Sequence, residues 1–161
     1  MKKIVTNAMR QLKAQKIPFE VIDYSVEEVG DHFGETIAQL TGIPAQQSFK
    51  TLVARGEKNG IAVVCIPADQ EVDLKKLARI AGEKKIELVP VRELLALTGY
   101  VRGGVSPVGM KKKYPTYFDA SAQGQEFIAV SAGACGAAVW IRPQDLCRAT
   151  GADFADLTKE E

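Results

Sequence analysis

Two glycines, a proline and three lysines stand close together in the segment GYVRGGVSPVGMKKKYPTYFDA, residues 99–120, and could form a binding site. Gly103 and Gly104 lack a Cβ atom, so their backbone can adopt left-handed dihedrals and bring N–H groups close to a ligand. Pro107 fixes its own φ and lowers the entropy lost when the loop is held in one shape. These properties suit a preorganised cradle for a carbonyl or phosphate oxygen. An ordinary turn is the alternative interpretation.

Lys111, Lys112 and Lys113 follow this loop and place positive charge beside it. Cations next to a glycine cradle favour a polyanionic substrate whose reacting end enters the loop while its backbone lies on the lysines. The alternative is that the lysines form a solvated face. The formal net charge of +1 excludes a generally basic nucleic-acid coat, so nucleic-acid binding must come from a local patch. The lysine triplet is the leading candidate for that patch.

Lys50 is a further candidate because it lies inside the β-rich segment FKTLVA. Strand alternation puts it on the same face as Leu52 and Ala54, both apolar, whereas Thr51 points to the opposite face. Lys50 either reaches water near the strand end or holds an oxyanion or phosphate. Ser131, in the segment AVSAG, could orient a substrate amine or hydroxyl.

The sequence lacks the features of an activated enzyme nucleophile. No G-x-S-x-G elbow surrounds Ser131, and a single histidine, His32, excludes two-histidine metal sites. Cys65 is predicted to be buried in the core. Cys135 lies in a glycine-rich turn, which leaves a thiol-dependent enzyme as an open alternative. Together with Cys147 these cysteines contain no C-x-x-C motif, which favours reduced thiols.

Length and composition predict one globular domain spanning residues 1–161. The chain is 46% hydrophobic, which is enough for a core without metals or disulfides. The N-terminal segment MKKIVTNAMRQLKAQ becomes polar by Thr6, and no stretch is long enough to span a membrane. We therefore expect a soluble, cytoplasmic protein.

Hydrophobic periodicity and turn residues predict helices and strands that intermix without a regular βαβ rhythm, so we expect an α+β domain with a mixed sheet. Helical segments are predicted at residues 5–12, 25–28, 36–41, 74–81, 94–98 and 143–150. Strands are predicted at residues 19–24, 48–56, 60–67, 116–120, 126–133 and 136–141. The second and third strands are joined by a short polar turn and should form a central antiparallel hairpin.

The segments FKTLVA, EVDLKKLA, GYVRGGVSPVGMKKKYPTYFDA and AVSAG together resemble aminoacyl-tRNA deacylases of the YbaK/EbsC type. This family is related to the editing insertion of bacterial prolyl-tRNA synthetase, and the resemblance covers nearly the whole chain. It implies an α+β domain with a mixed, strongly curved sheet flanked by helices. It also implies release of a wrong amino acid from tRNA, chiefly cysteine from Cys-tRNA(Pro) and also from Cys-tRNA(Cys), without a metal or cofactor. Prolyl-tRNA synthetase is the implied protein partner.

The resemblance also implies roles for individual residues. Lys50 is similar to an essential lysine near the 3′-terminal adenosine, and Gly103–Pro107 is similar to the G-x-x-x-P loop that holds the aminoacyl carbonyl. Lys50 and Gly103 are thus the expected catalytic residues, and the lysine triplet should contact the tRNA. The expected substrate-binding residues are Tyr24, Phe33, Thr51, Gly104, Pro107 and Ser131.

The family mechanism is substrate-assisted. The thiol of the cysteine substrate attacks its own ester carbonyl to give a cyclic thiolactone, while the enzyme supplies orientation and oxyanion stabilisation. Related members commonly read G-x-R-G with an acidic residue in the next strand, where this chain has Cys135 and Ala138. Recognition of the substrate amine can therefore differ. The alternatives are an editing deacylase for another small amino acid such as alanine, or a non-catalytic tRNA- or protein-binding module.

Overall fold

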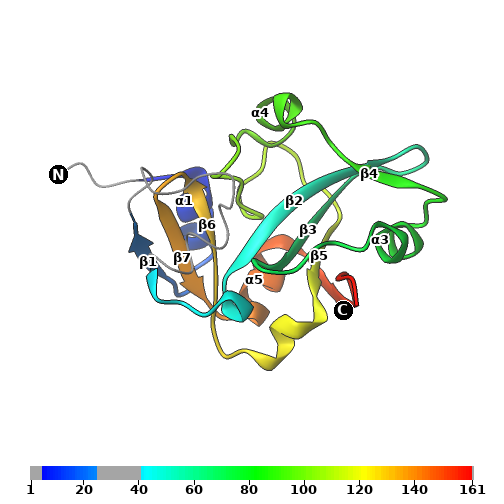
Figure 1. Cartoon of the computed structure of the whole chain (residues 1–161). Helices are drawn as coiled ribbons and strands as arrows, with labels where there is room; N and C mark the ends of the chain where they lie inside the picture. The colour runs from blue at the N-terminus through cyan, green and yellow to red at the C-terminus, as the bar shows by residue number, and fades with distance from the viewer. Residues whose placement is uncertain (1–4, 25–40, 161) are drawn as a thin grey trace.

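Two β-sheets and four α-helices make up the part of the chain that the computed structural model describes, residues 5–24 and 41–160 (Figure 1). The antiparallel three-stranded sheet has the order β1 (Glu20–Asp23), β7 (Ala137–Ile141), β6 (Ile128–Ala134). The mixed five-stranded sheet has the order β4 (Ile86–Leu88), β2 (Phe49–Gly56), β3 (Gly60–Pro67), β5 (Thr116–Asp119), β8 (Asp153–Ala155). The prediction of an α+β domain is confirmed.

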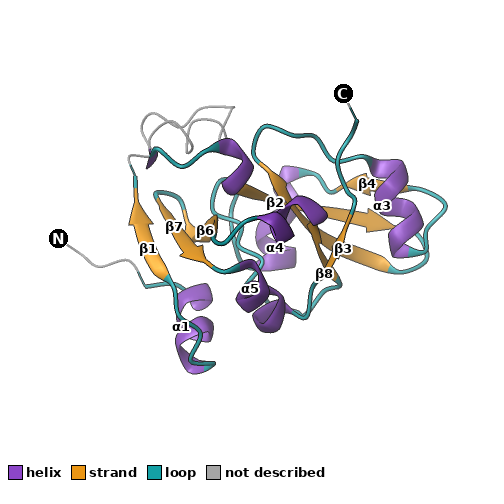
Figure 2. Ribbon diagram, turned by 90° about the horizontal axis from the view of Figure 1, so that it is seen from below, coloured by secondary structure: helices purple, strands orange, loops and turns teal. Residues whose placement is uncertain are grey.

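The prediction of one strongly curved sheet is wrong. The strands divide between two separate sheets, and neither of them is strongly curled. Figure 2 shows the two sheets on opposite sides of the molecule, with α5 (Pro143–Thr150) between them. The physical reason is that a large hydrophobic cluster fills the space between the sheets, with Phe49 and Phe118 from one and Val130 and Val139 from the other. Each sheet thus buries one face against the other through this shared core.

The four helices overlap segments that the sequence predicts to be helical. They are α1 (Asn7–Ala14), α3 (Leu74–Ala81), α4 (Leu94–Thr98) and α5, with short 3-10 segments at Ala45–Gln47, Val91–Glu93 and Ala120–Gly124. The Asp73 carboxylate accepts hydrogen bonds from the N–H groups of Lys75 and Lys76 and so begins α3, and Gly82 ends it with φ of 74°. The expected helical segments at 25–28 and 36–40 lie outside the described residues.

The strands β2 and β3 form the predicted antiparallel central hairpin, in which Val53 lies opposite Val63. The sequence analysis missed β4 and β8, which have three residues each and lie at the two edges of the five-stranded sheet. Three residues are too few to show a strand periodicity, so these edges depend on tertiary packing. On the outer face of this sheet, α3 packs over a second cluster that includes Ala54, Val64 and Leu77.

One parallel bridge joins the two sheets. Ser48, directly before β2, pairs with Ala129 of β6. Both residues are buried, at 4% and 2% exposure. The bridge therefore holds the start of β2 against β6, where the two sheets meet. In the described part of the chain, no helix is long and apolar enough to cross a membrane.

Candidate functional site

The glycine loop forms a tight turn that lies against the β6–β7 hairpin. The Gly104 N–H donates a 2.9 Å hydrogen bond to the Val101 carbonyl, and Gly103 has φ of +87°. A Cβ atom on Gly104 would lie 3.1 Å from the Cys135 nitrogen and 3.1 Å from the Ala134 carbonyl carbon. The backbone of the loop therefore approaches the hairpin more closely than a side chain would allow.

The remainder of the loop is buried and closed at its base. The Tyr100 hydroxyl donates a 2.6 Å hydrogen bond to the Val108 carbonyl, and the Val108 N–H donates to the Ser106 hydroxyl at 3.2 Å. Burial raises the pKa of Tyr100 to about 12, so its hydroxyl stays protonated and keeps donating. The sequence analysis did not single out Tyr100. The signal that could have identified it is its position at the start of the loop, shortly before the glycine pair.

Several N–H groups of this loop face no acceptor in the described structure. Within residues 5–24 and 41–160, no hydrogen bond is found from the N–H groups of Gly103, Val105 or Ser106. Backbone donors held in one shape can stabilise a developing negative charge on oxygen. The loop can therefore act as an oxyanion-binding element.

Tyr24 lies beside the same hairpin turn. Its N–H donates a 2.9 Å hydrogen bond to the Gly136 carbonyl, which extends the pairing of β1 with β7 by one residue. Burial raises the pKa of the Tyr24 phenol to about 12, although a hydrogen bond with the Gly136 backbone lowers it in part. The Cys135 Sγ atom in turn lies 3.6 Å from the Arg102 carbonyl of the glycine turn. Tyr24, Cys135 and the loop thus form one cluster.

Ser131 and Ala138 lie on the face of the three-stranded sheet that points away from its core with α1. They are paired across β6 and β7, and Ala138 is paired with Ile22 of β1. Because side chains alternate along a strand, Tyr24 shares this face with Ile22. The Ser131 hydroxyl accepts a 3.1 Å hydrogen bond from the Gly133 N–H at a β-bulge. This hydrogen bond holds the hydroxyl in place while leaving its own proton to donate.

Lys50 approaches the same face through the bridge between the sheets. It lies two residues after Ser48, and Ser131 lies two residues after the bridge partner Ala129. In a parallel pair, two residues that lie equally far along their strands from the paired residues have their side chains on the same face. Lys50 is half-buried. The structure therefore brings Lys50 and Ser131 to the junction of the sheets.

Two expected site residues, Thr51 and Pro107, have other surroundings. The Thr51 hydroxyl lies 3.4 Å from the Cys65 Sγ atom, on the opposite face of β2 from Lys50. Cys65 is fully buried, as predicted, and burial raises its pKa to about 12. Phe33 lies outside the described residues. Pro107 is buried at the far end of the loop, away from the hairpin turn, where it lines a separate pocket.

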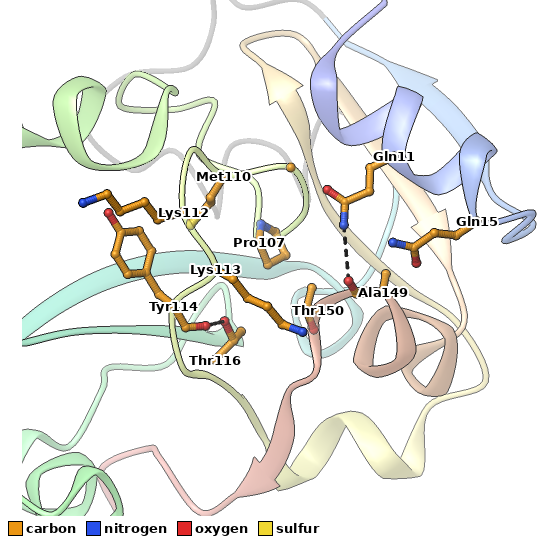
Figure 3. Close-up of a pocket in the computed structure, with 11 residues that line it drawn as sticks. Gln11, Gln15, Pro107, Met110, Lys112, Lys113, Tyr114, Thr116, Ala149 and Thr150 are labelled. Carbon is orange, nitrogen blue, oxygen red and sulfur yellow. Dashed lines mark hydrogen bonds between the residues drawn. The ribbon is translucent and has the colours of Figure 1, made fainter. Parts of the chain in front are cut away.

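The three lysines differ in their position relative to that pocket (Figure 3). All three are exposed, but only Lys112 and Lys113 line the pocket, opposite α1 and α5. Lys111 instead donates its backbone N–H to the Thr98 carbonyl at 3.1 Å. Among the residues described, no group of three or more His, Cys, Asp or Glu side chains could hold a metal ion.

The sequence is similar to those of known proteins. The model of the family "Aminoacyl-tRNA editing domain" matches residues 27–149. The chain is 43% identical, over 97% of its length and 94% of the other protein, to "Putative Cys-tRNA(Pro)/Cys-tRNA(Cys) deacylase EbsC" of Enterococcus faecalis. It is 38% identical over 55% of its length to the proline–tRNA ligase of Thermodesulfovibrio yellowstonii, of which it covers 14%.

The fold is also similar to solved structures. One of them is a crystal structure described as "a putative trans-editing enzyme for prolyl tRNA synthetase". It superposes with a TM-score of 0.83 at 26% identity, covering 98% of this chain and 100% of that one.

Proposed function

Because the chain belongs to the aminoacyl-tRNA editing domain family, we propose that it is a trans-editing deacylase that removes cysteine from mischarged Cys-tRNA(Pro), and from Cys-tRNA(Cys). The observation that carries this proposal is the 43% identity to EbsC over 97% of the chain. Residues 1–161 then form one editing domain. The enzyme acts in the cytoplasm, where charged tRNA is used, and receives its tRNA from prolyl-tRNA synthetase.

The glycine loop is the proposed oxyanion-binding element. The ester carbonyl of the substrate lies against the N–H groups of Gly103 and Val105, which have no acceptor among the described residues. As the carbonyl is attacked, negative charge develops on its oxygen, and these donors stabilise that charge. Gly104 keeps the loop in contact with the β6–β7 turn, and Pro107 keeps its far end fixed.

Lys50 is the proposed cationic partner of the substrate. Its place at the junction of the sheets, near Ser131, suits an ammonium that binds the phosphate of the terminal adenosine. Tyr24 and Ser131 share the face that leads to the loop, and we assign them to contacts with the substrate amino acid, together with Phe33. Thr51 acts indirectly. It follows Lys50 in β2, and its hydroxyl contacts Cys65 on the opposite face of the sheet.

The bond cleavage needs no nucleophile from the protein. The cysteine thiol of the substrate attacks its own ester carbonyl, a C–S bond forms, and the C–O bond to the ribose breaks. The thiol proton is transferred to the departing ribose oxygen, so the products are a cyclic thiolactone and free tRNA. The enzyme accelerates this step by holding thiol and carbonyl in an attacking geometry and by stabilising the oxyanion.

A single-turnover assay with tRNA(Pro) charged with cysteine tests the proposal. Wild-type protein should release cysteine, and Lys50→Ala should slow release by about 100-fold, the usual effect of removing one group that stabilises transition-state charge. Lys58→Ala is the matched control, because Lys58 is an exposed lysine in the turn of the same hairpin. Full activity in Lys50→Ala would remove Lys50 from the mechanism.

The same assay with alanine-charged tRNA(Pro) tests the specificity. Release of cysteine but not alanine supports a substrate-assisted mechanism, because alanine carries no thiol. Release of alanine at a similar rate would show hydrolysis of a small amino acid instead. If wild-type protein releases neither amino acid yet binds tRNA, the chain is a non-catalytic module of this fold.

A further inference from the structure

The β-bulge in β6 begins at a residue of the proposed site. Ser131 is paired with Ala138, and the next pair is Ala134 with Ala137, so two residues of β6 are inserted between adjacent pairs. The N–H of Gly133, the second inserted residue, donates a 3.1 Å hydrogen bond to the Ser131 hydroxyl. A bulge bends its strand and changes the direction of neighbouring side chains. The shape of this bulge therefore decides where the Ser131 hydroxyl lies.

Thr6 holds the same bulge from the side of the sheet on which α1 packs. Its hydroxyl donates a 2.5 Å hydrogen bond to the carbonyl of Ala132, the first inserted residue. The same hydroxyl accepts a 3.1 Å hydrogen bond from the Met9 N–H and so caps α1. A hydroxyl can donate and accept at once, so the two contacts form together. Thr6 is 9% exposed and Ala132 is fully buried, so their contact is shielded from water.

Tyr100 joins this support to the glycine loop. Gly133 has φ of +96°, and a Cβ atom on it would lie 2.8 Å from the Tyr100 Cε1 atom and 3.4 Å from the Thr6 Cβ atom. The tyrosine ring therefore packs directly on the bulge, beside Thr6. The hydroxyl of the same ring closes the glycine loop through the Val108 carbonyl. The bulge, the start of α1 and the loop thus meet around Thr6 and Tyr100.

We infer that Thr6 is a positioning residue for the proposed deacylation, an inference that rests on the proposed function. Thr6 lies on the side of the sheet opposite Ser131 and acts through the backbone between them. It holds the Ala132 carbonyl, the bulge keeps its shape, and the Ser131 hydroxyl stays in a fixed position relative to the donors of the glycine loop. Groups that bind a transition state are effective only while their relative geometry is kept. One hydroxyl before α1 thereby contributes to the site.

A helix cap without any link to the site is the alternative role of Thr6. Asp73 provides the matched control, because its carboxylate caps α3 by accepting hydrogen bonds from the Lys75 and Lys76 N–H groups. The helix α3 packs on the outer face of the five-stranded sheet, and this cap does not involve β6. Thr6→Val and Asp73→Ala each remove a helix cap, which costs stability in both variants. Only Thr6→Val also removes the contact with the bulge.

Single-turnover release of cysteine from Cys-tRNA(Pro) tests the inference. Thr6→Val should slow release by about 10-fold, the upper range for the net effect of one neutral hydrogen bond. Thr6→Ser keeps the hydroxyl and should restore most of the rate, and Asp73→Ala should release cysteine at the wild-type rate. In a Ser131→Ala background, Thr6→Val should add little further loss, because the hydroxyl that Thr6 positions is already absent. A general loss of stability would instead act independently of Ser131.

Amide hydrogen exchange at Gly133, followed by NMR, gives a readout that does not depend on ester cleavage. Thr6→Val should reduce the protection of this N–H, and Asp73→Ala should leave it unchanged. The inference is overturned if the two variants lose activity equally, if Thr6→Val has its full effect in the Ser131→Ala background, or if the Gly133 protection does not change. If wild-type protein releases no amino acid but this protection depends on Thr6, the deacylase proposal fails and the support of the bulge by Thr6 stands.

Discussion

Tyr100 donates its phenolic hydrogen to the Val108 carbonyl at 2.6 Å, across a loop of seven intervening residues that contains every element of the G-x-x-x-P motif. Both residues are buried, with 5% and 1% exposure. This hydrogen bond closes the loop at its base. The glycines at one end and Pro107 at the other are thereby held in fixed positions, which is the condition for a preorganised binding element.

Replacement of Tyr100 by phenylalanine should destabilise the protein and slow catalysis. The Val108 carbonyl loses its partner while it stays buried, which costs about 1–3 kcal/mol of unfolding free energy. Tyr114→Phe is the matched control, because it removes a 2.7 Å hydrogen bond to the Leu97 carbonyl at a half-buried position outside the motif. Denaturant unfolding and single-turnover deacylation should show the larger loss in Tyr100→Phe. An equal catalytic effect of the two changes would contradict the proposed role of the closure.

Gly103→Ala should lower activity far more than its effect on stability explains. Gly103 has φ of +87°, where an alanine is strained by roughly 1–2 kcal/mol. Gly60→Ala imposes the same strain, since Gly60 has φ of +77° and open space where a Cβ would lie, but it belongs to the β2–β3 turn. The two variants should lose similar unfolding free energy, and only Gly103→Ala should lose deacylation. Equal activity in the two would remove Gly103 from the site.

The free energy of unfolding should fall as the pH rises from about 9 to 12. Burial raises the pKa of Cys65 from 9.0 to about 12 and the pKa of Tyr100 from 10.0 to about 12. The native state therefore keeps protons that the unfolded chain releases, so the stability is complete below about pH 9 and is lost above it. Urea unfolding at about pH 8, 9.5 and 11 measures this loss. Cys65→Ala should reduce the slope, whereas Cys135→Ala, which removes an exposed thiol, should keep it.

The three thiols should react with a disulfide reagent in a fixed order. Cys135 is exposed and should react first in the native state. Cys147 is half-buried with a pKa raised to about 11 by burial and should react slowly, and the buried Cys65 should react only after unfolding. Thiol counting with peptide mapping by mass spectrometry tests this order. Native labelling of Cys65 as fast as Cys135 would contradict the described packing.

Labelling of Cys135 should also reduce deacylation, because its Sγ atom lies 3.6 Å from the Arg102 carbonyl of the glycine turn and a bulky adduct must displace that turn. Cys135→Ser should remain active and become insensitive to the reagent. Inactivity of Cys135→Ser would instead support a thiol-dependent enzyme.

The sequence by itself determined the local elements of this protein. Asp73 and Gly82 mark the ends of α3, and the apolar β-rich run around Val63 marks β3, because caps and periodicity act over a few neighbouring residues. The glycine loop and Lys50 also stood out, because their residue types are unusual for their surroundings.

Only the tertiary structure decided how these parts meet. The bridge between Ser48 and Ala129 brings Lys50 towards Ser131, and the hairpin turn at Cys135 receives both Tyr24 and the glycine loop. These contacts join residues far apart in sequence, and no local pattern records them. The division into two sheets and the pocket that separates Lys112 and Lys113 from Lys111 have the same origin, since both depend on side chains that pack only after distant segments have come together.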